Sequence, residues 1–176
     1  EKGLAFAAPY GVKTVFTELE EMAATDKIDA VYIASPNKLH IEQARVFLEH
    51  GKHVICEKPL SAHAKDVAEL QALAKERGLI YLEAIMFMHL PQRKLLEEAL
   101  KKIGDISMAK IDFCQRSSKY DAYLAGSLPN IFNPALETGA LMDLGVYCVY
   151  PALYLFGKPQ NTLAVSHLLA SGADGS

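Results

Sequence analysis

The first half of the chain alternates short apolar runs with segments of helical periodicity. The runs at residues 29–34, 53–56 and 79–82 are almost continuously apolar and include several β-branched or aromatic members. Such runs are typical of strands that are buried on both faces of a sheet. The segments between them carry apolar residues every three or four positions, as one face of a helix does. This order predicts a parallel sheet with right-handed helical crossovers.

Polar residues and glycines mark the ends of the helices in this half. Asn37 and Ser61 stand where the two crossover helices begin and are expected to cap them, and Gly51 and Gly78 follow their last periodic residues. A further short helix is expected upstream, with Thr17 as its cap.

The second half has a different pattern. Helical periodicity occupies residues 91–102 and 136–156, and imperfect alternation or β-rich composition predicts strands at 106–115 and 162–169. Residues 116–134 contain serine, glycine, asparagine and two prolines, which predicts a long loop. Long loops of this kind are often functional or mobile.

Composition narrows the class of protein without changing this picture. The 176 residues are 51% hydrophobic and 22% charged, and the formal net charge is -3. That charge argues against general affinity for nucleic acid or for an anionic membrane. No apolar run is long enough to span a bilayer, and residues 4–9 are too short for a signal peptide. Cys56, Cys114 and Cys148 are odd in number and widely spaced, which fits reduced thiols in a cytoplasmic protein.

The first candidate for chemistry is the trio Glu57-Lys58-Pro59 at the end of the second predicted strand. In open parallel sheets, ligands bind at the carboxyl ends of the strands. Pro59 disfavours a helical backbone at Lys58, so the lysine is expected to project from the sheet edge. There it can hydrogen-bond a substrate hydroxyl and help to move its proton. A solvated surface lysine is the alternative that the pattern leaves open.

The second candidate is a pair of residues one helical turn apart. Asp143 and Tyr147 are four positions apart and share a helix face. A tyrosine can exchange a proton with a hydroxyl group when a nearby cation, such as a lysine, favours loss of its own proton. Asp143 can orient the hydroxyl of a sugar or alcohol. A tyrosine-lined packing face with a surface carboxylate is the alternative, and the pattern alone favours it.

The third candidate is the turn Ser35-Pro36-Asn37 together with His40, one turn into the following helix. A helix N-terminus attracts anions and carbonyl groups, although most such sequences are simply helix starts. Neither a CxxC nor an HExxH motif occurs, so no metal site is predicted. The G-x-G-x-x-G phosphate-binding motif is absent as well.

Three motifs in this order resemble those of the Gfo/Idh/MocA oxidoreductases. They are ASPNKLH at residues 34–40, EKP at residues 57–59 and GALMDLGVY at residues 139–147. Each motif alone is modest, but their joint occurrence is specific. The resemblance covers residues 4–156, which is most of the chain.

The resemblance implies an α/β fold and a chain truncated at both ends. Residues 1–85 are expected to be the C-terminal part of a dinucleotide-binding domain, a partial Rossmann-like parallel sheet. Residues 86–176 are expected to be the N-terminal part of an α/β (α+β) substrate and oligomerisation domain. The first strand of the family, its glycine-rich turn and the residue that selects NAD or NADP are expected to lie outside this sequence.

The resemblance also assigns roles to the candidate residues. It implies NAD or NADP as the cofactor and a catalytic set in which Lys58 and Tyr147 handle a proton and Asp143 orients the substrate. Tyrosine in place of the histidine of many members is similar to the dihydrodiol and xylose dehydrogenase branch. The residues implied to contact the cofactor are Ser35, Pro36, Asn37, His40, Glu57 and Lys58.

These expectations together define a hypothesis of function. The protein would transfer a hydride between nicotinamide and a hydroxyl-bearing carbon of a small-molecule sugar, polyol or diol. It would act as a homo-oligomer, with no nucleic-acid or membrane partner. Two alternatives stay open: a non-catalytic regulator of the same fold that binds a nucleotide or sugar, and an inactive fragment without the phosphate-binding turn.

Overall fold

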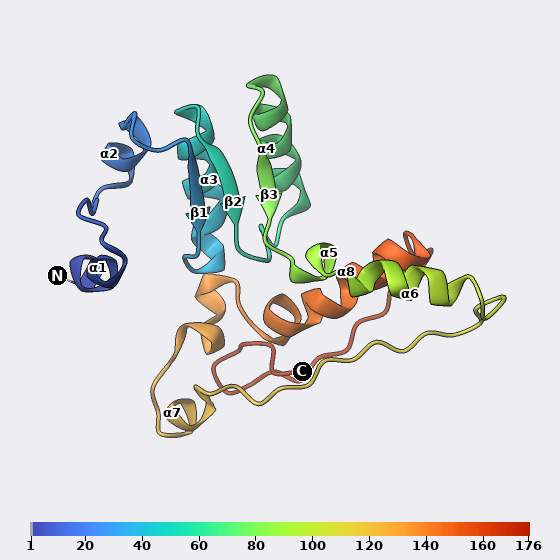
Figure 1. Ribbon diagram of the computed structural model, residues 1–176. Helices are drawn as coiled ribbons and strands as arrows, with labels where there is room; N and C mark the ends of the chain where they lie inside the picture. The colour runs from blue at the N-terminus through green and yellow to red at the C-terminus, as the bar shows by residue number, and fades with distance from the viewer. Residues whose placement is uncertain (1) are drawn as a thin grey trace.

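A parallel sheet of three strands organises the first half of the molecule (Figure 1). The structure is a computed structural model and describes residues 2–176. The strands β1 (Ala30–Ile33), β2 (His53–Cys56) and β3 (Tyr81–Glu83) lie in the order β1-β2-β3, and both neighbouring pairs are parallel. The predicted α/β fold with a parallel sheet is thereby confirmed.

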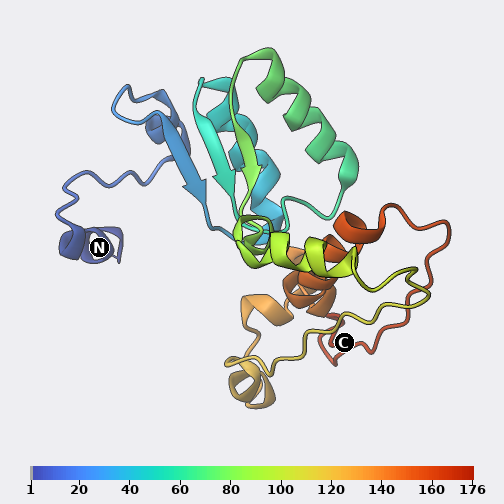
Figure 2. The ribbon, with the colours of Figure 1, turned by 45° about the vertical axis from the view of Figure 1, so that its right-hand side comes forward.

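The helices α3 (His40–Glu49) and α4 (Ala64–Glu76) cover one face of this sheet (Figure 2). Between the helices and the strands lies one cluster of buried side chains: Ala23, Val31, Ile33, Ala44, Phe47, Leu48, Val54, Cys56, Leu60, Leu70 and Ala74. On the other face Tyr32, Ile55 and Leu82 are exposed. The prediction of strands buried on both faces is therefore wrong for the described residues, because α3 and α4 cover the same side.

The N-terminal segment is helical and irregular by turns. The helices α1 (Lys2–Ala7) and η1 (Ala8–Tyr10) end at Gly11, whose φ of 67° suits a glycine. They lie apart from the sheet in Figures 1 and 2. After an irregular stretch, α2 (Leu19–Ala24) packs against α3.

The predicted helix caps are wrong: Thr17 is not at the cap position, and the side chains of Ser61 and Asn37 bond elsewhere. The cap position of α2 is Glu18 rather than Thr17, and its side chain makes no capping bond. Ser61 Oγ accepts from the N–H of His63 at 2.9 Å, in a turn before α4. Asn37 begins the short helix η2 (Asn37–Leu39) and donates to a distant carbonyl. Short polar side chains near helix starts commonly find such competing partners.

The second half consists of helices joined by long irregular segments (Figure 1). Its helices are α5 (Met86–His89), α6 (Gln92–Leu100), α7 (Tyr120–Leu124), η3 (Asn130–Phe132), η4 (Pro134–Leu136), η5 (Leu141–Gly145) and α8 (Val146–Phe156). Among residues 2–176, no helix combines the length and apolarity needed to cross a membrane.

The two strands predicted in this half are wrong. Residues 106–115 and 162–169 are irregular segments, and within the described chain neither joins a sheet. The second segment makes one isolated bridge, from Leu168 to Asp174. A strand needs a neighbour along its length. The second segment pairs only at its end, where His167 and Leu169 exchange backbone bonds with residues 173–176, and the first joins no sheet in the described structure. The predicted helix at 136–156 is also interrupted: it begins at Leu141 with a π-helical turn.

Candidate active site

The carboxyl ends of the three strands meet the helical half at one edge of the sheet (Figures 1 and 2). The register places Ile33 beside Cys56, and Cys56 beside Glu83. The residues that follow the strands, including Ser35 and Lys58, therefore share this edge. Helix η5 and the start of α8 come up to it from the second half.

Lys58 makes the central contact at this edge. Its Nζ donates to the backbone oxygen of Asp143 at 2.6 Å and to the carboxylate Oδ1 at 2.9 Å. The Lys58 side chain is 12% exposed and that of Asp143 40% exposed, so the pair is partly shielded from water. Charge-assisted bonds of this length are among the strong ones in proteins. Residues 85 positions apart in the chain are thus joined across the two halves.

Tyr147 completes this group. Its ring centroid lies 4.8 Å from Lys58 Nζ, close enough for a cation–π contact. The ring of Phe113 packs edge-on against the ring of Tyr147, with the two centroids 5.8 Å apart. The structure therefore brings the three predicted catalytic side chains together: Lys58, Asp143 and Tyr147.

A π-helical turn presents Asp143. Helix η5 widens the backbone over residues 141–145 before the regular α8, and π-turns occur frequently at functional sites. The turn is anchored by Asp174, whose carboxylate accepts from the N–H of Leu141 at 2.8 Å. Gly139 allows the approach: its φ is 139°, and a Cβ there would lie 2.9 Å from the Cβ of Asp174. The sequence pattern gave no signal for this turn.

Glu57 lies beside Lys58 and holds a tyrosine that the sequence reasoning missed. The hydroxyl of Tyr32 on β1 donates to the Glu57 carboxylate. This hydrogen bond raises the pKa of Tyr32 to about 12, with smaller contributions from burial and nearby charges. The Glu57 carboxylate also accepts from the N–H of Lys58 at 3.2 Å. Tyr32 lies on the exposed face of β1. The sequence signal that could have identified it is its position three residues before Ser35, close to the end of the strand.

A small cavity of about 280 Å³ opens at the end of β1. Three of the predicted cofactor residues line it: Ser35, Pro36 and Asn37. Asn37 Nδ2 donates to the backbone oxygen of Glu137 at 2.8 Å, which fixes the wall formed by the second half. Asp143 lines the same cavity.

His40 lies behind this cavity rather than in its lining. It is fully buried, and its two ring nitrogens lie 2.9 Å from the carbonyl oxygens of Pro59 and Ser35. The resemblance implied contact between His40 and the cofactor. In the structure the imidazole contacts the backbone of the two loops that follow β1 and β2.

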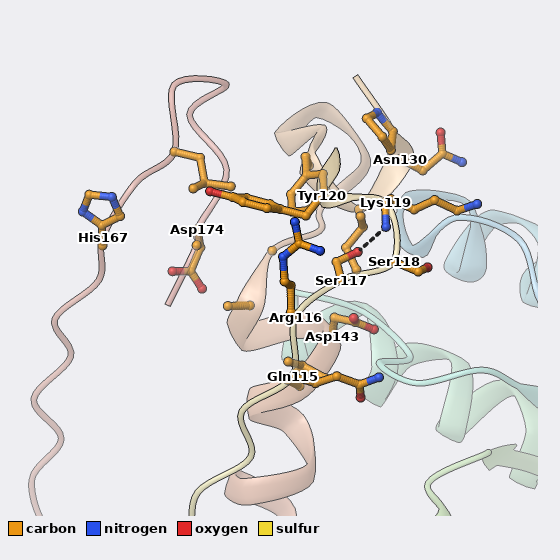
Figure 3. A pocket seen from close by; sticks show the side chains of 18 residues that line it. Gln115, Arg116, Ser117, Ser118, Lys119, Tyr120, Asn130, Asp143, His167 and Asp174 are labelled. Carbon is orange, nitrogen blue, oxygen red and sulfur yellow. Dashed lines mark hydrogen bonds between the residues drawn. The ribbon is translucent and has the colours of Figure 1, made fainter. Parts of the chain in front are cut away.

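A larger cavity of about 1040 Å³ lies on the other side of Asp143. Figure 3 shows Arg116 and Tyr120 of the long loop on one side of this space and Asp174 of the C-terminal segment on the other. Arg116 is held by Asp121 through two bonds of 2.6 and 3.3 Å. The loop was predicted to be functional or mobile, but its individual side chains carried no sequence signal. Asp143, Asn130 and Ile131 line both cavities.

Burial changes the titration of two groups at the sheet edge. Desolvation raises the pKa of Cys56 to about 12, and the nearby Glu57 and Glu83 add to the shift. Cys56 therefore stays a protonated thiol at neutral pH. Desolvation also raises the pKa of Glu83, while the N–H of Leu60, which donates to its Oε1 at 3.1 Å, works in the opposite direction.

The side chains gathered at the site can transfer protons and stabilise charge. Within residues 2–176, no group of three or more His, Cys, Asp or Glu side chains is arranged to hold a metal ion. A lysine ammonium beside a phenol and a carboxylate can bind a hydroxyl group, move its proton and stabilise charge on its oxygen.

Comparison with known proteins agrees with this arrangement. Residues 1–85 match the model of the oxidoreductase family with an NAD-binding Rossmann fold, and residues 93–174 match the C-terminal domain of Gfo/Idh/MocA proteins. An α/β protein with a parallel sheet and a polar site at its carboxyl edge is the class that the fold defines. The chain belongs to the Gfo/Idh/MocA oxidoreductase family.

Named relatives lie on the branch that Tyr147 indicated. Scyllo-inositol 2-dehydrogenase (NADP(+)) IolU of Bacillus subtilis is 47% identical over 99% of this chain and 53% of its own length. Mouse trans-1,2-dihydrobenzene-1,2-diol dehydrogenase is 30% identical over 96% of this chain and 50% of its own length. The chain spans about half the length of the curated relatives it matches.

A solved relative shares the fold. The crystal structure of KijD10, a 3-ketoreductase from Actinomadura kijaniata in complex with NADP and TDP-benzene, superposes with a TM-score of 0.73 and 31% identity. The match covers 89% of this chain and 46% of that one.

Proposed function

We propose that this chain forms the nicotinamide and substrate site of an NAD(P)-dependent dehydrogenase that oxidises a secondary hydroxyl of a sugar, polyol or diol. The observation that carries the proposal is the contact of Lys58 with Asp143 beside the ring of Tyr147, at the carboxyl edge of the sheet. The names of the relatives, dehydrogenases of an inositol, a diol and a sugar, support this substrate class.

The residues of the smaller cavity fit the nicotinamide end of the cofactor. Ser35 and Asn37 supply polar groups there, and Asp143, which also lines the cavity, connects it to Lys58. When bound, NAD(P) supplies the acceptor or donor of the hydride. A small polar cavity at a strand end is the position in which such folds hold this group.

Each of the three central side chains has a role in handling the hydroxyl. Tyr147 takes the hydroxyl proton in oxidation and returns it in reduction. Lys58 donates a hydrogen bond to the reacting oxygen and stabilises negative charge on it. Asp143 holds Lys58 through Oδ1 and can accept from a second, adjacent hydroxyl, which suits polyols and diols.

The division of labour follows the chain. We infer that residues 1–85 serve the cofactor and residues 86–176 the substrate, and the ranges of the two family models support this division. The free thiols Cys56, Cys114 and Cys148 support a cytoplasmic setting. The highly exposed Leu163 and Val165 support assembly into a homo-oligomer, which sedimentation of the complete protein would test.

The test is turnover by the complete protein with NAD or NADP across a panel of inositols, sugars and diols. Lys58→Ala and Tyr147→Phe are each expected to lower kcat by roughly 10²–10⁴-fold, the range for losing a general acid–base group. Lys65→Ala and Tyr10→Phe alter exposed residues that make none of the contacts described for the site and serve as matched controls.

Two results would contradict the proposal. Full turnover by both Lys58→Ala and Tyr147→Phe would remove these residues from the reaction. Binding of NADPH by the wild type, with no turnover of any compound in the panel, would favour the regulatory alternative.

A further inference from the structure

The peptide unit that follows Lys58-Pro59 is held at both of its polar atoms by side chains. The carbonyl oxygen of Pro59 lies 2.9 Å from His40 Nδ1. The N–H of Leu60, in the same peptide unit, donates to Glu83 Oε1 at 3.1 Å. We call these two contacts, of His40 and of Glu83 with the Pro59–Leu60 peptide, the clamp. His40 begins α3, the helix that follows β1, and Glu83 ends β3, so the two side chains come from the elements on either side of the central strand β2.

Both clamping side chains occupy costly positions. His40 is fully buried, and Glu83 is half-buried with its pKa raised by desolvation. Leu60 itself is 7% exposed and belongs to the apolar cluster. An ionisable side chain in such a place destabilises the fold unless hydrogen bonds replace the hydration that burial removes, so both side chains depend on their contacts with this peptide.

The clamp restricts the backbone from which Lys58 projects. Among the described residues the one cis peptide is Lys58–Pro59, so the Pro59–Leu60 peptide is trans and its C=O and N–H point in opposite directions. Bonds on both sides prevent that peptide plane from rotating. Lys58 lies one residue away, and its Nζ must reach the oxygens of Asp143 at 2.6 and 2.9 Å.

We propose that Glu83 and His40 are positioning residues that act through Lys58. They hold the Pro59–Leu60 peptide so that the ammonium group stays on Asp143 and beside the ring of Tyr147. His40 adds a second connection, because its Nε2 lies 2.9 Å from the carbonyl oxygen of Ser35 at the cofactor cavity, and an imidazole that carries a proton on both nitrogens donates to both carbonyls. This inference rests on the proposed function, since it explains how the lysine of that site is aimed.

Glu83 offers a matched pair of substitutions. Glu83→Gln keeps an acceptor oxygen for the Leu60 N–H, whereas Glu83→Met keeps the length and removes the acceptor. Both replace a half-buried carboxyl group with a neutral side chain, so both are expected to fold. Glu83→Met is expected to lower kcat by about 10- to 100-fold, as small displacements of a catalytic group do, and Glu83→Gln to stay near the wild type.

His40 offers a second pair that separates its two contacts. Asparagine places an amide near the position of Nδ1, and glutamine places one near Nε2. His40→Gln is therefore expected to keep the Ser35 contact, lose the Pro59 contact and lower kcat with little change in the Kd for NADPH. His40→Asn is expected to do the reverse, weakening NADPH binding more than it lowers kcat.

A double-mutant cycle shows whether Glu83 acts through Lys58. In the Lys58→Ala background, Glu83→Met should cause little further loss of turnover, because the group that it positions is gone. A readout without catalysis accompanies it: the rate at which Lys58 is acetylated by acetic anhydride, followed by mass spectrometry. Glu83→Met should speed acetylation of Lys58 and leave that of the exposed Lys65 unchanged.

The inference is overturned if Glu83→Met lowers turnover by the same factor with and without Lys58, or if Lys58 acetylation does not change. It is also overturned if Glu83→Met lowers the melting temperature while kcat stays that of the wild type, since the role would then be structural. A wild type that turns over no substrate contradicts the proposed function instead, and the acetylation result still decides the positioning role.

Discussion

Residues 2–85 bury one continuous cluster of apolar side chains, whereas residues 86–176 bury few and leave large ones exposed. Leu48 and Leu70 in the first half are fully buried, and Leu163 and Val165 in the second half are 92% and 88% exposed. Yet the second half supplies Asp143, Tyr147 and the long loop around the larger cavity.

Polar contacts rather than apolar burial connect the two regions at the site. Lys58 bonds to Asp143, and Asn37 bonds to the backbone of Glu137. The comparison teaches that the stability of the described chain and its chemistry depend on different sets of residues. Substitutions in the two regions should therefore have separable effects on unfolding and on turnover.

The largest expected effect is on the stability of the sheet half. Leu48→Ala should lower the free energy of unfolding by about 2–5 kcal/mol, because it leaves a cavity among α3, α4 and the sheet. Leu95→Ala, at a 70% exposed position of α6 in the second half, should change it by no more than about 0.5 kcal/mol. Denaturant unfolding of the complete protein measures both, and equal losses would break the comparison.

Next in size is an effect on turnover without an effect on the core. Asp143→Asn keeps the shape of the side chain and removes the charge that holds Lys58, so kcat should fall on the order of 10²-fold. The melting temperature should change little. Asp26→Asn, at an exposed position near α2, is the control. Unchanged turnover of Asp143→Asn would show that the ion pair is not needed.

A smaller effect is expected at the junction below η5. Gly139→Ala combines a positive φ with a contact of 2.9 Å to Asp174, and should lower stability by about 1–3 kcal/mol. Gly126→Ala also has a positive φ but meets nothing within 4 Å, so it isolates the backbone strain. Equal losses in the two variants, measured by thermal unfolding, would show that the close approach to Asp174 adds nothing.

The smallest effect concerns pH. Burial raises the pKa of Glu83, so in the window above the ordinary value of 4.5 the folded protein holds a proton that the unfolded chain has lost. The stabilising contribution of Glu83 is therefore present at low pH and is lost as the pH rises through this window. Glu83→Gln should make the protein more stable than the wild type near pH 7, with the difference fading below pH 4.5. A constant difference across this range would mean that Glu83 titrates normally.

The strands and crossover helices of the first half could be predicted because their signals are local. The runs at 29–34, 53–56 and 79–82 and the glycines that end the helices depend on neighbouring residues alone. The second half could not be predicted in the same way. Residues 106–115 and 162–169 have the composition of strands, but a strand also needs a partner, which composition does not reveal.

The candidate site divides along the same line. Sequence motifs identified Lys58, Asp143 and Tyr147. They did not show that Lys58 and Asp143, 85 positions apart in the chain, lie 2.9 Å from each other in the fold. Tyr32 was missed as a member of the site, because it sits inside an ordinary strand pattern. The sequence places Glu83 at the end of the third strand, on the same edge as Ser35 and Lys58, and the register confirms this, but the pattern gave Glu83 no role. The burial of His40 could not be predicted either. A histidine near a helix start can be exposed or buried, and the sequence does not show which.

What the sequence determined by itself is the kind of sheet and the edge at which chemistry would occur, because both follow from periodicity, handedness and the direction of the strands. The tertiary structure alone decided which side chains meet at that edge and how they are held. The π-turn that presents Asp143, the Tyr32–Glu57 bond and the clamp of His40 and Glu83 on the Pro59–Leu60 peptide all arise from contacts between distant segments. Their energies depend on distance and burial, and these quantities exist only once the chain has folded.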